Sequence, residues 1–264
     1  MTRKTIIDTF VFLGPTLPVA AAQRILADAA YLPPAAVGDV YLLARQLARR
    51  RRPARIAIVD GYFERMAAVW HKEILHALEQ GITVYGASSM GALRAAELHD
   101  YGMIGVGRVF ADYRAGRLTD DDEVAVAHAP AEYGYACASE AMVNLRAGLG
   151  LARKRGIIGA RTHDTLVRLV KQQFYRERTW DSMIAAGHAS GVRARELDAL
   201  AAFGAGRRPD VKAADARALL RRLAREPLPA SKPKVSWRMA RTWFWERFTE
   251  LAEEAEESEA VREA

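Results

Sequence analysis

The stretch ITVYGASSMGALRAAEL, residues 82–98, decides the fold of this chain. Its first four residues, 82–85, are the β-branched and aromatic type that favours a buried strand. Small residues follow at 86–89 and at Gly91, and positions 92–99 have the composition of a helix. A strand, a tight turn and a helix in immediate succession are typical of a parallel α/β protein.

The residues before this stretch repeat the same alternation. Residues 5–13 and 55–59 are short apolar runs that predict two further strands, ending at Gly14-Pro15 and at Asp60-Gly61. Between them we expect a helix from Thr16 to Ala29 and a second one that starts near Asp39 and ends in the arginines 49–52. Residues 70–78 have helical spacing of their apolar positions, and Gly81 stops that helix. The sequence therefore predicts a parallel-type sheet with flanking helices.

The residues after this stretch predict a different architecture. Residues 102–131 are rich in glycine and then acidic, which favours a long functional loop with a candidate strand at 124–127. Residues 139–154, 164–186 and 196–203 are helical by pattern, so the C-terminal part is predicted to be mostly α-helical. Three prolines between 227 and 233 form a linker before a Trp- and Glu-rich helix at 237–263. We predict three regions, 1–150, 151–226 and 227–264.

Composition narrows the class of protein. The chain has 264 residues, 50% of them hydrophobic and 27% charged, as expected for a folded globular protein. Its single cysteine, Cys137, cannot form an internal disulfide, and no apolar run is long enough to span a membrane, so we expect a cytoplasmic protein without membrane contact. The net charge of +7 suits an acidic protein partner, and we predict no nucleic-acid binding.

The turn at 86–91 is the candidate for chemistry. A nucleophile at such a strand-turn-helix elbow needs small neighbours, and the helix that follows contributes backbone amides and positive potential. Ser88 has a glycine two residues before it, whereas Ser89 has one two residues after it. Residues 87–92 are also similar to the segment around the nucleophile of ClpP-type serine proteases, which favours Ser89. The alternative is a turn whose two serines only cap the helix.

Six blocks in order resemble TfuA-like proteins, over roughly residues 5–150. The blocks are FLGPTL at 12–17, DGYF at 60–63, VWHKEIL at 69–75, SSMGALRAAEL at 88–98, DDEVAV at 121–126 and SEAMVN at 139–144. The resemblance implies an accessory protein of backbone thioamidation. Its implied partners are a YcaO-type enzyme, which activates the peptide amide with ATP, and a ThiS-like sulfur-carrier protein. It also implies a hydrolase-like site in region 1–150 that cleaves the carrier thiocarboxylate with a serine-lysine pair, and Lys72 is the lysine carried over.

Lys72 can assist Ser89 or Ser88 only if its helix starts near Val69, because a start at Tyr62 would place it on the order of 15 Å from the strand end. We predict the later start.

We predict no metal and no cofactor, because the acidic run 120–123 has no histidine or cysteine at ligand spacing. Other predicted contributions are an oxyanion site or turn at Gly14, Gly61, Met90 and Gly91, and support or partner binding by Asp60, His71, Arg94 and Glu97.

Two alternatives remain open at this stage. His71, His99 and His128 are rival bases, and a Ser-His-Asp arrangement with Asp60 or Asp100 is one of them. The second alternative is a non-catalytic adaptor that docks the YcaO-type enzyme to its peptide or carrier and needs no nucleophile.

Overall fold

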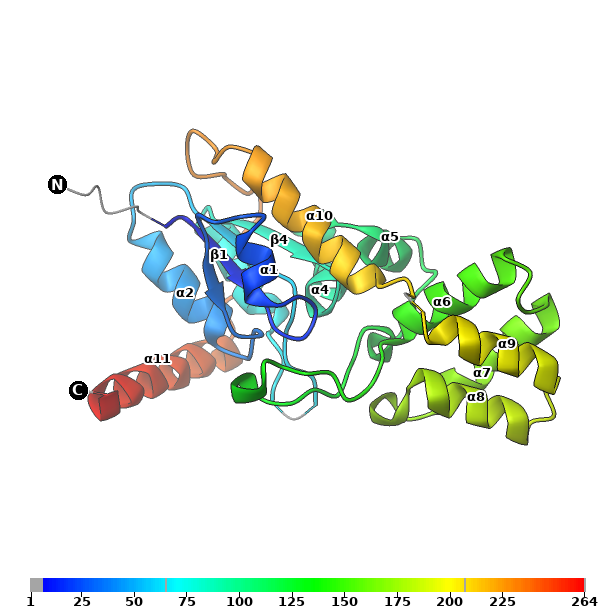
Figure 1. Ribbon diagram of the computed structural model, residues 1–264. Helices are drawn as coiled ribbons and strands as arrows, with labels where there is room; N and C mark the ends of the chain where they lie inside the picture. The colour runs from blue at the N-terminus through cyan, green and yellow to red at the C-terminus, as the bar shows by residue number, and fades with distance from the viewer. Residues whose placement is uncertain (1–6, 65, 207, 264) are drawn as a thin grey trace.

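A computed structural model describes residues 7–64, 66–206 and 208–263, with the backbone alone for 258–263. Its centre is one sheet of five parallel strands in the order β2-β1-β3-β4-β5 (Figure 1). The strands are β1 Thr9–Phe12, β2 Ala30–Leu32, β3 Arg55–Ile58, β4 Thr83–Ala87 and β5 Ile104–Val106. The predicted fold class, a parallel sheet with flanking helices followed by a mostly helical part, is confirmed.

Helices cover both faces of the sheet. Alternate side chains of β3 point to the two faces of the sheet. Ile56 and Ile58 lie in one apolar cluster, and Ala57 lies in the other. The first cluster includes residues of α2 (Asp39–Ala48), α3 (His71–Glu79) and α4 (Met90–Leu98), and the second includes residues of α1 (Val19–Gln23) and α10 (Val211–Arg225). The carboxyl ends of β3 and β4 therefore open at one edge of a three-layer core.

A separate helical lobe lies beside this core (Figure 1). It consists of α6 Met142–Lys154, α7 Ala160–Gln172, α8 Trp180–Ala189 and α9 Ala194–Gly204, which share their own apolar cluster. The predicted boundary at 150 falls inside α6, and residues 151–226 do not pack as one unit, because α10 leaves the lobe and returns to the sheet. The lobe is thus an insertion between α5 and α10 of the core.

Three predictions of local structure were wrong, and two predicted helices had wrong bounds: 164–186 is interrupted between α7 and α8, and 237–263 becomes helical only at Trp243. In place of one helix from Thr16 to Ala29, the chain has the five-residue α1 followed by β2. The predicted loop 102–131 contains β5 and α5 (Arg108–Arg114), and residues 124–127 form no strand. Both missed strands have three residues and are half-buried at the two edges of the sheet, so they carry little periodic signal. The short 3-10 helices are η1 His99–Tyr101, η2 Asp121–Glu123, η3 Ala131–Tyr133 and η4 Tyr175–Glu177.

The C-terminal segment folds back on the core. After α10, residues 227–242 run past α2, α3 and α4 without regular structure, and Trp237 donates its Nε1 hydrogen to the carbonyl of Tyr101 at 3.1 Å. The final helix, α11 (Trp243–Glu263), then packs against α2 through Trp245 and Tyr41, whose rings meet edge to face at 5.4 Å. Among the described helices, none combines the length and the apolar character that crossing a membrane requires.

Candidate functional site

The turn between β4 and α4 is strained. Only Ser88 and Ser89 separate the strand from the helix, and the amide of Ser89 donates to the carbonyl of Ala87 at 2.8 Å. This bond closes a three-residue γ-turn around Ser88, whose φ of +70° is uncommon for a residue with a side chain and costs roughly 1–3 kcal/mol. Such strain is typical of functional sites, because the surrounding structure must impose it.

Glycines allow this turn to approach the neighbouring strand. A Cβ added to Gly91 would lie 1.7 Å from the carbonyl oxygen of Ile58, and one added to Gly86 would lie 2.0 Å from the carbonyl oxygen of Gly91. A larger residue at Gly91 would push α4 away from β3, and one at Gly86 would push α4 away from β4. Gly91, the second residue of α4, therefore lies against β3, and it does not line the cavity described next.

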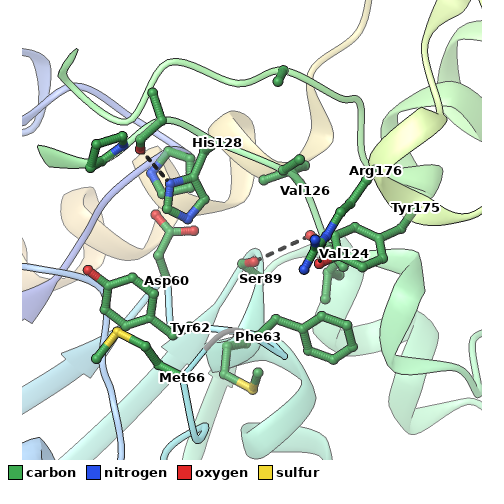
Figure 2. Close-up of a pocket in the computed structure, with 18 of the residues that line it drawn as sticks. Asp60, Tyr62, Phe63, Met66, Ser89, Val124, Val126, His128, Tyr175 and Arg176 are labelled. Carbon is green, nitrogen blue, oxygen red and sulfur yellow. Dashed lines mark hydrogen bonds between the residues drawn. The ribbon is translucent and has the colours of Figure 1, made fainter.

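A cavity of about 710 Å³ lies between this edge of the sheet and the helical lobe (Figure 2). Its walls come from three separate parts of the chain: the ends of β1, β3 and β4, the loop 121–138, and the start of η4 in the lobe. Four of the predicted site residues line it, namely Asp60, Gly61, Ser89 and Met90. Tyr62, Phe63, Met66, Val126, His128, Tyr175 and Arg176 complete much of the wall.

A buried lysine and Ser89 face the same backbone carbonyl in one wall of this cavity. Lys212, the second residue of α10, is 4% exposed, and its Nζ donates to the carbonyl of Val124 at 2.7 Å. The hydroxyl of Ser89 faces the same carbonyl oxygen at 3.5 Å. Burial lowers the pKa of Lys212, although the charges of Asp60, Cys137 and Asp210 oppose that shift. A lysine with a lowered pKa is a better proton acceptor than an exposed one.

The two serines differ in access. Ser89 is 8% exposed and lines the cavity, whereas Ser88 is fully buried and its hydroxyl lies 3.5 Å from that of Thr16. The side chain of Ser88 therefore points to the β1 end of the sheet, and that of Ser89 points to the substrate-sized space.

Asp60 joins the ends of β1 and β3. Its carboxylate is 1% exposed and accepts hydrogen bonds from the amides of Gly14 and Thr16 at 2.9 and 3.1 Å and from the Thr16 hydroxyl at 2.6 Å. Because the Gly14 amide already donates to Asp60, it cannot also donate to a reacting oxygen. Asp60 thus positions the loop after β1 beside the elbow.

Two backbone amides remain available at the elbow. Among the described residues, the N–H groups of Gly61 and Met90 have no acceptor. The two residues touch, since a Cβ added to Gly61 would lie 2.8 Å from Cγ of Met90. Met90 is the first residue of α4, where unpaired amides and the helix dipole favour a negative charge. The arrangement has the elements of an oxyanion site.

The structure does not bring Lys72 to this cavity. Its helix begins at His71, as the late-start prediction required, yet Nζ of Lys72 donates to the carbonyl of Ala240 and the hydroxyl of Thr242, at 3.1 and 2.8 Å. These acceptors belong to the C-terminal segment. The side chain of Lys72 therefore ties α3 to the start of α11.

The remaining predicted residues form a surface cluster. The Glu97 carboxylate accepts from Arg94 at 2.7 Å and lies 2.8 Å from Nε2 of His71, and Arg94 also donates to the carbonyl of Val69. Burial would raise the pKa of Glu97, but the bonds from His71 and Arg94 lower it overall. None of these three side chains lines the cavity. They connect the start of α3 to α4.

The acidic run 120–123 is bound by basic side chains of the helical lobe. Lys171 forms ion pairs with Asp120, Asp122 and Glu123. Arg178, itself fully buried, pairs with Asp122, and Arg146 pairs with Glu123 at 2.8 Å. These positive charges occupy the space in which a cation would have to bind, so the cluster joins the loop to the lobe.

Sequence reasoning missed Lys212. The signal was present, because Lys212 falls on the apolar stripe of α10 together with Ala216, Leu219 and Leu223, all of which are buried. A lysine at such a position is either paired or functional. His128, considered as a rival base, does line the cavity, whereas His71 and His99 do not.

The comparisons with known proteins agree with the resemblance. The model of the family described as TfuA-like protein matches residues 60–179. No curated protein matches the chain. The matched region includes the elbow, Asp60 and the whole cavity wall from 121 to 138, and it extends beyond residue 150 through the end of α6, α7 and η4. Block 12–17 and Lys212 lie outside it.

Proposed function

We propose that this chain, whose residues 60–179 match the TfuA-like family, hydrolyses the thiocarboxylate of a ThiS-like sulfur-carrier protein and supplies the sulfide to a YcaO-type enzyme. The TfuA-like family is associated with thioamidation. The observation that carries the proposal is the shared Val124 carbonyl, at which a buried lysine meets a serine that opens into a cavity.

Ser89 is the nucleophile in this proposal. Its hydroxyl reaches the cavity, and the strained γ-turn at Ser88 holds it at the start of α4. The Oγ of Ser89 attacks the thiocarboxyl carbon and forms an acyl-enzyme ester. Ser88 is a less suitable nucleophile because its side chain is fully buried.

Lys212 is the base. Only the neutral amine of a lysine accepts a proton, and burial lowers the pKa of Lys212 in that direction. Lys212 takes the proton of Ser89 during attack and returns it to the Ser89 oxygen when water releases the acyl group. Lys72, the lysine implied by the family resemblance, is the alternative base, but its ammonium donates to Ala240 and Thr242.

The amides of Gly61 and Met90 hold the negative charge that develops on the carbonyl oxygen. Both are unpaired among the described residues, and they lie on the β3 and β4 sides of the attacking serine. Backbone donors that are fixed before the reaction are worth roughly 3–4 kcal/mol of barrier each in comparable sites. No movement of the chain is needed to form them.

The shape of the cavity suits the end of a protein chain. Its volume of about 710 Å³ is within the usual range for ligand sites, and it is too small for a folded carrier. A carrier that ends in a flexible tail can insert only that tail, so the body of the carrier stays at the mouth between the loop 121–138 and the lobe.

An adaptor function is the second candidate, and the exposed aromatic residues of α11 favour it. Trp243 and Phe244 are 68% and 73% exposed, and the half-exposed Trp70 contacts Phe248 of the same helix. Exposed aromatic groups of this size are common at protein interfaces. An adaptor needs no nucleophile, so it would still support thioamidation when Ser88 and Ser89 are both replaced by alanine.

Sulfide release from a purified, thiocarboxylated ThiS-like carrier tests the proposal. We expect Ser89→Ala to release sulfide at least about 1000-fold more slowly than wild type, because covalent catalysis is lost. Ser88→Ala is the matched control, with circular dichroism to verify folding. Undiminished release by Ser89→Ala would disprove the hydrolase mechanism, and thioamidation by the double variant would establish the adaptor.

A further inference from the structure

His128 lies in the wall of the cavity, and nothing in the proposed serine-lysine chemistry uses it. Figure 2 shows its ring above the carboxylate of Asp60, in the wall of the same cavity that Ser89 lines. The ring is half-buried between the rings of Tyr62 and Tyr135, with centroids 6.3 and 5.7 Å away. Two aromatic neighbours therefore hold the imidazole in one place.

One nitrogen of this imidazole is already bonded. Nδ1 of His128 lies 2.8 Å from the carbonyl oxygen of Ala129, and a carbonyl can only accept, so Nδ1 carries a hydrogen. The backbone here is fixed as well, because residues 128 and 137 form a bridge and the amide of Ala129 donates to Ala136 at 2.9 Å. Nε2 is left to exchange a proton with a molecule in the cavity.

The proposed substrate creates a need for such a group. A thiocarboxylate is an anion at neutral pH, because thioacids are stronger acids than carboxylic acids. When a serine attacks it, the tetrahedral intermediate carries one negative charge on oxygen and another on sulfur. If the carbon–sulfur bond then breaks unaided, sulfur departs as the doubly charged sulfide ion, which is a very poor leaving group. A proton donated to sulfur permits departure as hydrosulfide.

We infer that His128 is the acid that donates this proton through Nε2. The inference rests on the proposed hydrolase function and adds a third catalytic residue to it. With the carbonyl oxygen held by the amides of Gly61 and Met90, and Ser89 attacking from the side of Lys212, the sulfur is directed to the wall that contains His128. Tyr62 lines the cavity next to His128, and Tyr135 packs against the His128 ring without lining the cavity.

The protons balance over a full cycle. In the first half, the proton of Ser89 moves to Lys212, the Ser89 oxygen bonds to the carbon, and the carbon–sulfur bond breaks while the imidazolium of His128 protonates the sulfur. In the second half, neutral His128 takes a proton from the attacking water, and Lys212 returns its proton to the Ser89 oxygen. The products are a carboxylic acid and hydrosulfide, and each side chain recovers its starting state.

Two substrates separate this role from the rest of the mechanism. The first is the thiocarboxylated carrier, and the second is the same carrier as a 4-nitrothiophenyl thioester, whose thiolate leaves without a proton. His128→Asn keeps a donor for the Ala129 carbonyl and removes Nε2, and His128→Gln serves as a second variant should the first not fold. The control is His188→Asn, an exposed histidine of α8 outside the cavity.

In single-turnover experiments, which report only the first half of the cycle, we expect His128→Asn to release sulfide about 100-fold more slowly than wild type, while its release of nitrothiophenolate stays within about 3-fold. Sulfide release that stays within about 3-fold of wild type would overturn the inference. So would an equal loss with both substrates, because an acid for the sulfur affects only the first. Ser89→Ala is expected to lose both activities, and if it keeps both, the hydrolase function itself fails independently of His128.

Discussion

Two lysines of this molecule have the same kinds of partner in two different places. At the carboxyl edge of the sheet, Nζ of Lys212 donates to a backbone carbonyl that also faces the hydroxyl of Ser89. On the outer face, Nζ of Lys72 donates to a backbone carbonyl and to the hydroxyl of Thr242. Lys212 is 4% exposed, whereas Lys72 is only partly buried.

The difference teaches that burial, more than the identity of the partners, makes a lysine a candidate base. A charged ammonium in water is stabilised by solvent, and one that is excluded from water loses that stabilisation, so its neutral form becomes accessible. The two places also differ in access for a substrate. Ser89 opens into the cavity, whereas Thr242 lies where the C-terminal segment covers α3. We therefore expect the first region to control activity and the second to control stability.

The largest expected effect is on catalysis. Lys212→Met keeps the length of the side chain and removes the base, so we expect sulfide release to fall at least about 1000-fold, with little loss of stability because an apolar group suits a buried site. Lys72→Met is the matched control and is expected to stay within about 3-fold. A reversed result, with Lys72→Met inactive and Lys212→Met active, would assign the base to the outer face.

The next effect is on the stability of the outer region. Trp245 is 3% exposed and its ring contacts those of Tyr41, His76 and Phe248. We expect Trp245→Ala to lower the free energy of unfolding by about 3 kcal/mol in urea denaturation, because it removes the buried anchor of α11. Trp243→Ala, at an exposed position of the same helix, should change it by less than about 0.5 kcal/mol. Equal effects would show that α11 is not held by Trp245.

The third effect is a pH dependence at the start of α3. Glu73 is fully buried, and desolvation raises its pKa from 4.5 to about 7, although the amides of Trp70, Tyr41 and Gly38 donate to it and oppose the shift. Since folding favours the protonated form, the stability that Glu73 contributes is present below pH 4.5 and is lost as the pH rises to about 7. The full shift corresponds to about 3 kcal/mol.

The Glu73→Gln variant has no ionisable group at this position, so its stability should not fall in this way as the pH rises. Between pH 4.5 and pH 8, we expect wild type to lose up to about 3 kcal/mol of unfolding free energy relative to Glu73→Gln. Urea denaturation of both proteins at a series of pH values measures it. Parallel pH profiles would mean that the three amides compensate fully for burial.

The core of the fold was predictable because its signals are local. The runs 55–59 and 82–85 are apolar on both sides, as buried parallel strands must be, and they predicted β3 and β4 within two residues. The start of α3 at His71 also followed from local spacing. The edge strands β2 and β5 were missed, since three half-buried residues leave no period to detect.

The candidate site was predictable only where it is contiguous. Small residues at 86–91 and the pair Asp60-Gly61 indicated a sharp elbow at strand ends, because a strand that leads directly into a helix admits no large side chain. The proposed catalytic lysine was not predictable in this way. Lys72 was selected by a block of sequence near the elbow, and Lys212 lies 123 positions beyond Ser89 in the chain.

The sequence by itself determined the parallel sheet, the sharp turn and the serine at its end, since strand and turn preferences act between neighbouring residues. Only the tertiary structure decided which carbonyl and which histidine line the cavity with that serine, and which lysine donates to that carbonyl. These groups belong to α10 and to the loop 121–138, and they meet only because α10 leaves the helical lobe and packs its apolar stripe on the sheet. Burial of Lys212 is a consequence of that packing, and it has no counterpart in local sequence.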